Sequence, residues 1–229
     1  MPSPPLTILF EDNHLLAVRK PAGLPTMGVA AGRTSVVTLA KDYLKEKYGK
    51  PGNVYLGVVS RLDASASGVL IFARTSKAAA RLTDQFRSGA VEKTYWALVE
   101  GTPDPAEASC VDWLRKDERQ MKMVVCGKNQ AGSQQARLHY RTLRKLSAGT
   151  WLEVLLATGR KHQIRVQLAQ RGHPILGDRK YGASTSFPNG IALHARRLEL
   201  EHPVRKTPLR LEASPPAAWG RFGIGNEFP

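Results

Sequence analysis

The first residues of the chain follow a pattern of two short apolar runs with polar residues between them. Apolar residues dominate 6–10 and 15–18, and the polar segment 11–14 separates them, which predicts a β-hairpin. Residues 20–25, Lys-Pro-Ala-Gly-Leu-Pro, predict an irregular loop, because proline and glycine interrupt both helices and strands. Two paired strands followed by a loop are therefore the first expected elements.

Two later segments show the spacing of an amphipathic helix. An apolar residue at every third or fourth position predicts a helix that starts after Thr34 or Ser35 and ends at Gly49. The same spacing predicts a second helix with Ser76 as its N-cap and Gly89 at its end. A shorter third helix is expected further along the chain.

Strands are more numerous than helices. They are expected at 54–59, 68–73, 93–99, 109–114, 121–125, 136–143, 151–157 and 191–200. Many of these strands are close neighbours in sequence, which indicates an α+β fold with a mixed, largely antiparallel sheet flanked by helices. Because no repeat, low-complexity tract or linker divides the chain, we expect residues 1–229 to form one domain.

Composition narrows the class of protein. Apolar residues make up 42% of the 229 residues, which excludes a disordered chain. No apolar run approaches the ~20 residues of a membrane-spanning helix, and the opening Met-Pro-Ser-Pro-Pro lacks the layout of a secretion signal. We therefore expect a soluble, cytoplasmic protein whose two cysteines, Cys110 and Cys126, stay reduced.

The net charge points to a polyanionic partner. Lys and Arg number 34 against 19 Asp and Glu, which gives a net charge of +15. Residues 111–180 hold fifteen Lys or Arg and five Asp or Glu, so 15 − 5 = +10 of the excess lies there. Nine of those fifteen are arginines, whose planar guanidinium suits phosphate. Because this segment is patterned like folded sequence, the charge predicts a shaped basic face rather than a basic tail.

One loop carries a carboxylate with little bulk around it. Residues 60–67, Ser-Arg-Leu-Asp-Ala-Ser-Ala-Ser, join two apolar strands and consist mainly of small residues. Asp63 in this setting can act as a nucleophile or a base, and Arg61 would lower its pKa. Aspartates are also frequent in turns, where they bond nearby backbone, and local sequence alone favours that interpretation.

The third helix, expected over 162–170, carries an arginine on its apolar side. On a helical wheel Arg165 lies beside Ile164 and Leu168. Its charge cannot be removed by deprotonation, so an inward arginine needs an anionic partner. That partner could be Asp63 or a bound phosphate.

The remaining candidates are weaker on spacing alone. Arg160 and Lys161 stand at the start of the third helix, where backbone N–H groups favour anions, although an exposed basic turn explains them equally well. Tyr95 lies in a strand, where packing is the usual role of tyrosine. Spacing typical of metal ligands is missing from His162, His173 and His194. The glycines match no nucleotide-binding motif, so neither a metal nor a cofactor is predicted.

Taken together, several of these segments resemble one family. Arg61-Leu62-Asp63 followed by Ser67-Gly68 resembles the R-L-D-x-x-x-S-G motif of the RluA-type pseudouridine synthases. Lys93-Thr94-Tyr95 resembles their K-x-Y strand, and residues 159–166 and 172–178 resemble their G-R-x-H-Q-I-R-V and G-H-P-I-x-G-D blocks. The closing strand of the family is similar to Leu193-His194-Ala195 and His202-Pro203. These blocks run in order from about residue 8 to residue 212.

The resemblance implies a pseudouridine synthase fold and the isomerisation of uridine to pseudouridine in RNA, without a cofactor. It implies that Asp63 is the catalytic carboxylate, which attacks the ribose or acts as its base. Tyr95 would stack on the uracil and help to remove a proton, and Arg165 would pair with Asp63. Arg61 would fill the space left by the flipped-out base, and Ile164 would pack near the pocket. Further substrate contacts would come from Arg160, Lys161, His162 and Gln163.

Three positions depart from the family pattern. Ser60 stands where many members have His, and Ala66 and Lys161 each stand where Thr is usual. These changes affect the rim of the site, and therefore the substrate and the rate, more than the reaction type. The hairpin expected from residue 6 leaves no room for an S4-type RNA-binding domain, so the catalytic domain itself would capture RNA, as a monomer.

Three hypotheses follow. The first is an RNA pseudouridine synthase that acts on ribosomal or transfer RNA. The second is a non-catalytic RNA-binding or RNA-folding protein that uses the same basic cleft. The third, a basic hydrolase that uses Asp63 and a histidine, lacks the expected metal or Ser/His/Asp pattern.

Overall fold

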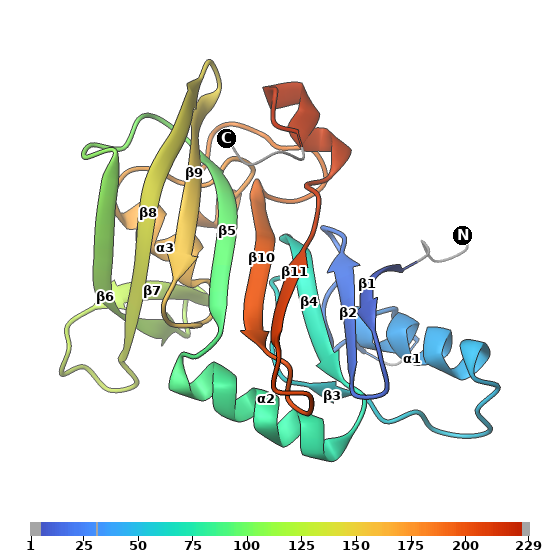
Figure 1. Cartoon of the computed structure of the whole chain (residues 1–229). Helices are drawn as coiled ribbons and strands as arrows, with labels where there is room; N and C mark the ends of the chain where they lie inside the picture. The colour runs from blue at the N-terminus through green and yellow to red at the C-terminus, as the bar shows by residue number, and fades with distance from the viewer. Residues whose placement is uncertain (1–5, 31, 226–229) are drawn as a thin grey trace. The chain divides into compact units, whose positions relative to one another are not determined.

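The computed structural model describes residues 6–30 and 32–225, which fold into two compact units (Figure 1). The first unit contains residues up to 91 together with 195–214, and the second contains 92–194 and the chain from 215. The positions of the two units relative to one another are not determined, so each is described by itself. The single domain expected from the sequence therefore stays a prediction, and residues 1–5, where no secretion signal was expected, lie outside the described residues.

The first unit is built on a sheet in which the pairs β1–β2, β2–β4, β3–β4 and β10–β11 are antiparallel. Strand order is β1-β2-β4-β10, with β3 paired to β4 and β11 paired to β10. The β1–β2 pair is the hairpin that the sequence predicts. The bounds of these strands are β1 Thr7–Glu11, β2 Leu15–Lys20, β3 Gly57–Val58, β4 Ser67–Ala73, β10 Leu193–Glu201 and β11 Pro208–Glu212.

Two helices cover opposite faces of this sheet. Helix α1, Val36–Lys47, packs against the side chains of Leu16 and Val18, whereas α2, Ser76–Ser88, packs against those of Leu15 and Ala17. Because successive strand residues point to opposite faces, β2 is apolar at every one of these positions. The unpatterned apolar runs of β2 and β4 thus reflect a sheet that is buried on both sides.

The helix caps differ in one place from the sequence prediction. Ser35 is the N-cap of α1, as expected, and its hydroxyl accepts a hydrogen bond from Thr38 N at 3.2 Å. For α2 the expected cap Ser76 is wrong by one residue, because Ser76 is the first helical residue and Thr75 is the cap. Thr75 has extended backbone dihedrals, and its Oγ1 accepts from Ala78 N at 3.2 Å.

The second unit is an antiparallel sheet with one helix against it. Strand order is β5-β9-β8-β6-β7, and helix α3, Gln163–Gln170, lies behind these strands in Figure 1. Val166 of α3 packs with Leu114, Met123 and Ala136 from three of the strands. The strand bounds are β5 Glu92–Val99, β6 Glu107–Asp117, β7 Lys122–Cys126, β8 Gln134–Leu146 and β9 Gly149–Leu156, and the short 3₁₀ helices are η1 Arg179–Tyr181 and η2 Ala217–Phe222.

The strand bounds differ from the prediction where the residues with buried side chains are not the residues whose backbone pairs in the sheet. The strand expected over 54–59 shrinks to Gly57–Val58, because Val54 and Leu56 bury their side chains against α1 without joining the ladder. Strands β6 and β8 instead extend beyond their apolar residues, because their polar residues continue the pairing. Strand β11 was not predicted, since its five residues include only two large apolar side chains.

A buried lysine fixes the loop that follows β3. Lys20, which ends β2, is 0% exposed, and its Nζ donates hydrogen bonds to Pro21 O and Leu24 O, both at 2.7 Å, and to Ala64 O at 3.0 Å. Burial lowers the pKa of Lys20 to about 7, although the nearby Asp63 carboxylate acts in the opposite direction. The three carbonyl oxygens therefore tie residues 21–24 and the Asp63 loop to one ammonium group.

Three further hydrogen bonds reinforce this attachment. Gly23 N donates to Ala64 O at 2.7 Å. The hydroxyl of Thr26 donates to Leu62 O at 2.9 Å and accepts from Leu62 N at 3.2 Å. The loop expected over 20–25 is irregular from residue 21, since Lys20 is still part of β2, and it braces residues 62–64.

We predict that Gly68→Ala destabilises the protein by about 3 kcal/mol or more. Gly68 has a φ of 123°, and a Cβ added there would lie 2.3 Å from the backbone oxygen of Ala195. Gly89→Ala is the matched control, because its φ of 80° is also left-handed but no atom lies within 4 Å. Urea unfolding should show a loss of only about 1 kcal/mol for the control, and equal losses for the two variants would contradict the prediction.

We predict a pH-dependent contribution of Lys20 to stability. The pKa is about 7 in the folded chain and 10.5 at its ordinary value, so between these pH values the unfolded chain binds more protons. Relative to Lys20→Met, the wild type should therefore gain stability as pH rises from 7 towards 10, by at most about 1.4 kcal/mol per pH unit. Below pH 7 the difference should be constant. Urea unfolding of both proteins from pH 6 to pH 9.5 measures this, and a flat difference across that range would disprove it.

Candidate active site

The first unit contributes the loop that carries Asp63. Asp63 is half-buried, Arg61 is exposed, and Ala66 N donates to Asp63 O at 3.1 Å to close the turn. The loop has little side-chain bulk, as the sequence indicates. Lys20 is a cation near Asp63 that the sequence interpretation missed; the available signal was an ionisable residue at the end of an otherwise apolar strand.

The second unit contributes Arg165. Arg165 is 6% exposed, so it is buried as the helical wheel predicts, although residues 163–168 of α3 are all buried and no single inward side is distinguished. Its Nε donates to Asp178 Oδ2 at 2.6 Å and its Nη2 donates to Asp178 Oδ1 at 2.8 Å. This bidentate ion pair gives the buried guanidinium an anionic partner within its own unit. The sequence resemblance includes Asp178 only as the last residue of the 172–178 block and assigns it no role, and the pairing of Arg165 with Asp63 stays a prediction.

Tyr181 connects Arg165 to the start of α3. The guanidinium of Arg165 lies 5.0 Å from the centroid of the Tyr181 ring. The Tyr181 hydroxyl forms a hydrogen bond of 2.8 Å with His162 Nδ1 and accepts one of 3.1 Å from Met123 N. His162, the N-cap of α3, has a φ of 53°, which its side-chain contacts help to hold. His162 is therefore fixed in orientation beside the buried arginine.

Gln163 is a buried support for the basic turn in front of it. Its Oε1 accepts from Thr158 Oγ1 at 2.7 Å and from Arg160 N at 3.0 Å, and its Nε2 donates to Arg137 O at 3.0 Å. Arg160 and Lys161 on this turn are both exposed. Gln163 therefore acts on the shape of the turn, whereas its two basic neighbours point their charges to solvent.

Tyr95 lies on the same side of the sheet as α3. It pairs with Val154 of β9, which pairs in turn with Tyr140 of β8. Tyr140 shares its face of β8 with Ala136, which packs against α3. Tyr95 is half-buried, between the buried Thr94 and Trp96. The second unit thus brings Tyr95 and Arg165 to one side of its sheet.

Lys93 and Ile164 occupy two further positions in this unit. Lys93, two residues before Tyr95, points to the same face, and burial lowers its pKa. Ile164 is 4% exposed. Both are therefore held within packed surroundings rather than in open solvent.

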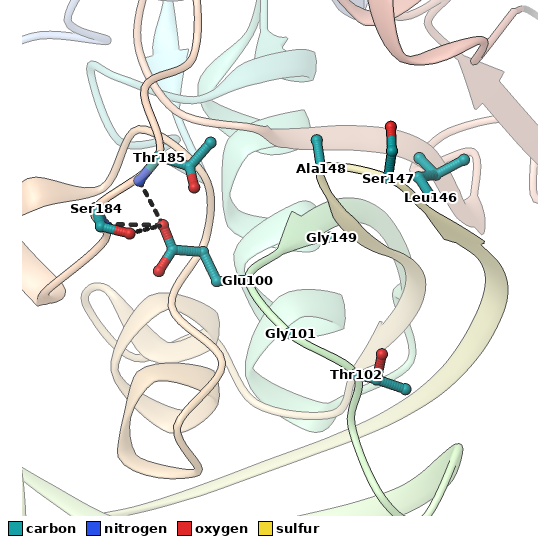
Figure 2. A pocket seen from close by; sticks show the side chains of 9 residues that line it. All are labelled: Glu100, Gly101, Thr102, Leu146, Ser147, Ala148, Gly149, Ser184 and Thr185. Carbon is teal, nitrogen blue, oxygen red and sulfur yellow. Dashed lines mark hydrogen bonds between the residues drawn. The ribbon is translucent and has the colours of Figure 1, made fainter.

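An open pocket of about 340 Å³ in the second unit includes none of these candidates (Figure 2). It is lined by 100–102, 146–149 and 184–185. Burial alone would raise the pKa of Glu100, but hydrogen bonds from Thr185 N at 2.5 Å and Ser184 N at 2.8 Å lower it. Glu100 thus anchors the 184–185 loop, which explains the polar character of this pocket.

Neither a membrane-spanning helix nor a metal-binding cluster is present among the described residues. No helix among them is long and apolar enough to cross a membrane. Within the same residues, no group of three or more His, Cys, Asp or Glu side chains is arranged to hold a metal ion.

Known proteins match the chain over most of its length. A family model described as RNA pseudouridylate synthase matches residues 14–170. The ribosomal large subunit pseudouridine synthase D of Xylella fastidiosa is 37% identical, over 93% of this chain and 66% of its own length. The protein of the same name from Xanthomonas campestris is 35% identical, with the same two shares. The chain thus spans just under two thirds of the length of these relatives.

A solved structure matches the fold. Human RNA Pseudouridylate Synthase Domain Containing 4 superimposes with a TM-score of 0.79 at 26% identity, covering 97% of this chain and 94% of that one. This likeness confirms the expected α+β fold with a largely antiparallel sheet, and identifies it as the pseudouridine synthase fold. Because the family model covers well over half of the 229 residues, the chain belongs to the RNA pseudouridylate synthase family.

Proposed function

We propose that this protein isomerises uridine to pseudouridine in the RNA of the large ribosomal subunit. Family membership is the observation that carries the proposal. The choice of ribosomal RNA over transfer RNA is supported by the relatives from Xylella and Xanthomonas, whose names specify the large ribosomal subunit. The net charge of +15 fits an RNA substrate, and we expect the protein to act in the cytoplasm as a monomer.

The reaction breaks the N-glycosidic bond of uridine, turns the base and rejoins it to the ribose through carbon. No atom is gained or lost overall, so no co-reactant is required. Asp63 is the carboxylate that attacks the ribose or acts as its base. Its half-buried position within a loop of small residues supports this role.

Arg165 holds the Asp63 carboxylate in the proposed site. A guanidinium has five N–H donors, and Asp178 accepts from two of its nitrogen atoms. In the proposed site the same guanidinium also donates to Asp63. Burial of Arg165 supports this assignment, because a charged hydrogen bond is stronger where water is excluded.

The other side chains of the proposed site contact the RNA. Tyr95 stacks on the uracil and helps to remove its proton, while Ile164 packs beside the pocket. Arg61, which is exposed, fills the space left by the flipped-out base. The exposed Arg160 and Lys161 bind phosphate.

Two neighbours complete the set of substrate residues. His162 contacts the substrate in an orientation set by Tyr181, with which it shares a hydrogen bond of 2.8 Å. Gln163 contributes through the turn that it supports.

We predict that Asp63→Asn lowers the rate of pseudouridine formation by roughly a thousandfold or more while RNA binding persists. Asparagine has a similar shape but supplies neither a nucleophile nor a base. The substrate is ribosomal RNA from a strain that lacks the gene, and the product is counted by pseudouridine sequencing. Asp84→Asn is the control, because Asp84 is an exposed carboxylate in the same unit.

Three outcomes separate the hypotheses. Undiminished turnover by Asp63→Asn would refute the role of Asp63. Binding by the wild type without any new pseudouridine would favour a non-catalytic RNA-binding protein. New pseudouridine in transfer RNA instead of ribosomal RNA would overturn the proposed substrate.

A further inference from the structure

One face of the sheet in the second unit is not covered by α3. Leu114 of β6 and Ala136 of β8 point towards α3, so the residues next to them in sequence point to the opposite face. We call the part of that opposite side on β6, β8 and the end of β9 the open face; nearer β5 the same side is buried, at Trp96 and Trp151. The members of the open face include Val111, Trp113 and Arg115 on β6, Arg137, His139 and Arg141 on β8, and Leu155 on β9. Figure 1 shows the strands in front of α3 with no helix over this side.

The open face exposes large apolar side chains. Val111 is 54% exposed and Leu155 is 45% exposed. In register, Val111 is opposite Arg137, and Leu155 is opposite His139. Exposed apolar groups beside an arginine and a histidine indicate contact with a macromolecule that offers both flat apolar surfaces and negative charge.

Positive charge is unevenly distributed along this face. At one end His139 pairs with Glu107 at 2.9 Å, and Arg141 pairs with Glu153 at 2.8 Å. At the other end the exposed guanidinium of Arg137 has no partner among the described side chains. The excess charge of the open face therefore gathers around Arg137.

Further cations surround Trp113 at that same end. Lys128 Nζ lies 5.8 Å from the centroid of the Trp113 ring. Arg115, two residues along β6, is held by a hydrogen bond from its Nε to Gln130 Oε1 at 3.2 Å. The carboxylate of Asp117 at the end of the strand accepts from Arg119 N and Gln120 N, so it is engaged with backbone.

The end of the open face around Trp113 and Arg137 is connected to the turn that carries Arg160 and Lys161. Trp113 is opposite Gln135 in the sheet, and Arg160 Nε donates to Gln135 O at 3.0 Å. Arg137 O accepts from the side chain of Gln163, which supports the same turn. The basic turn is thus tied to β8 by two hydrogen bonds to the backbone of Gln135 and Arg137.

We propose that the end of the open face around Trp113 and Arg137 binds single-stranded RNA that flanks the target uridine. This inference rests on the proposed function, since it extends the RNA contact beyond the reacting nucleotide. A base stacks on Trp113, and Arg137, Lys128 and Arg115 contact the phosphates beside it. The charge argues against a second copy of the chain, because two such faces would repel one another.

The first test compares two pairs of substitutions that remove equal charge. Arg137→Gln with Lys128→Gln changes the proposed site, whereas Arg141→Gln with Lys145→Gln changes β8 outside it. The first pair should weaken binding to a single-stranded RNA oligonucleotide roughly tenfold and lower the salt slope by about 0.7 for each lost phosphate contact. The KM for ribosomal RNA should rise equally while kcat is unchanged. Equal effects of the two pairs would overturn the proposal.

The second test uses the intrinsic fluorescence of Trp113. All four tryptophans lie in the described part of the chain, and Trp96, Trp151 and Trp219 are at most 3% exposed. Binding of the oligonucleotide should therefore quench emission through Trp113, and Trp113→Phe should abolish most of the quenching. Quenching that persists in Trp113→Phe would place RNA elsewhere, and a change in Trp113 emission with protein concentration alone would indicate self-association instead.

Failure of this proposal is distinguishable from failure of the proposed function. If the Arg137 and Lys128 variant forms pseudouridine normally and binds the oligonucleotide as tightly as the wild type, the proposed site on the open face is refuted. The proposed function is unaffected by that result. Absence of pseudouridine from the wild-type reaction would refute the function, whatever the oligonucleotide binds.

Discussion

Burial of the ammonium of Lys20 is the constraint on which the proposed site in the first unit depends. A buried charge is costly unless its donors are satisfied, and Lys20 finds three carbonyl oxygens at 2.7 to 3.0 Å. One of these oxygens belongs to Ala64, beside Asp63. Loops are usually the most variable part of a fold, but this one is held by a group that cannot relax without losing its partners. The loop therefore holds Asp63 in a defined position, although the neighbouring side chains are small.

In the second unit a buried cation is again stabilised by its hydrogen-bond partner, here Arg165 by Asp178. Arg165 keeps its charge inside the fold because Asp178 accepts two hydrogen bonds from it and the Tyr181 ring lies against it. Tyr181 also fixes His162, so one aromatic side chain links the buried arginine to the turn that carries the exposed basic residues. The buried and exposed charges of this segment are thus parts of one connected arrangement.

The ion pairs show which of the positive charges are available to a partner molecule. The sequence concentrates the positive excess in residues 111–180. Several of these cations are neutralised locally, as Arg141 is by Glu153 and Arg171 is by Asp112. Arg137 has no such partner among the described side chains, so its charge is available to a partner molecule. Counting charges along the chain cannot separate these two groups.

Periodicity predicted the elements whose burial is regular. The hairpin from residue 6, the helix after Ser35 and the helix that ends at Gly89 all follow from apolar spacing and turn residues. The prediction failed where burial and hydrogen bonding separate, as at Val54, which is buried without joining the ladder. Spacing records which side chains avoid water, and it does not record which backbone groups are paired.

For the candidate site, the sequence by itself supplied the residues that carry recognisable chemistry, such as Asp63, and it placed Arg165 on the inward face of a helix. Only the tertiary structure identified Lys20, Asp178 and Tyr181 as their supports. The physical reason is that a hydrogen bond or ion pair depends on a distance of a few ångströms in space, between residues whose separation along the chain carries no signal. Local pattern determines what each residue can do, and the fold determines which residues act together.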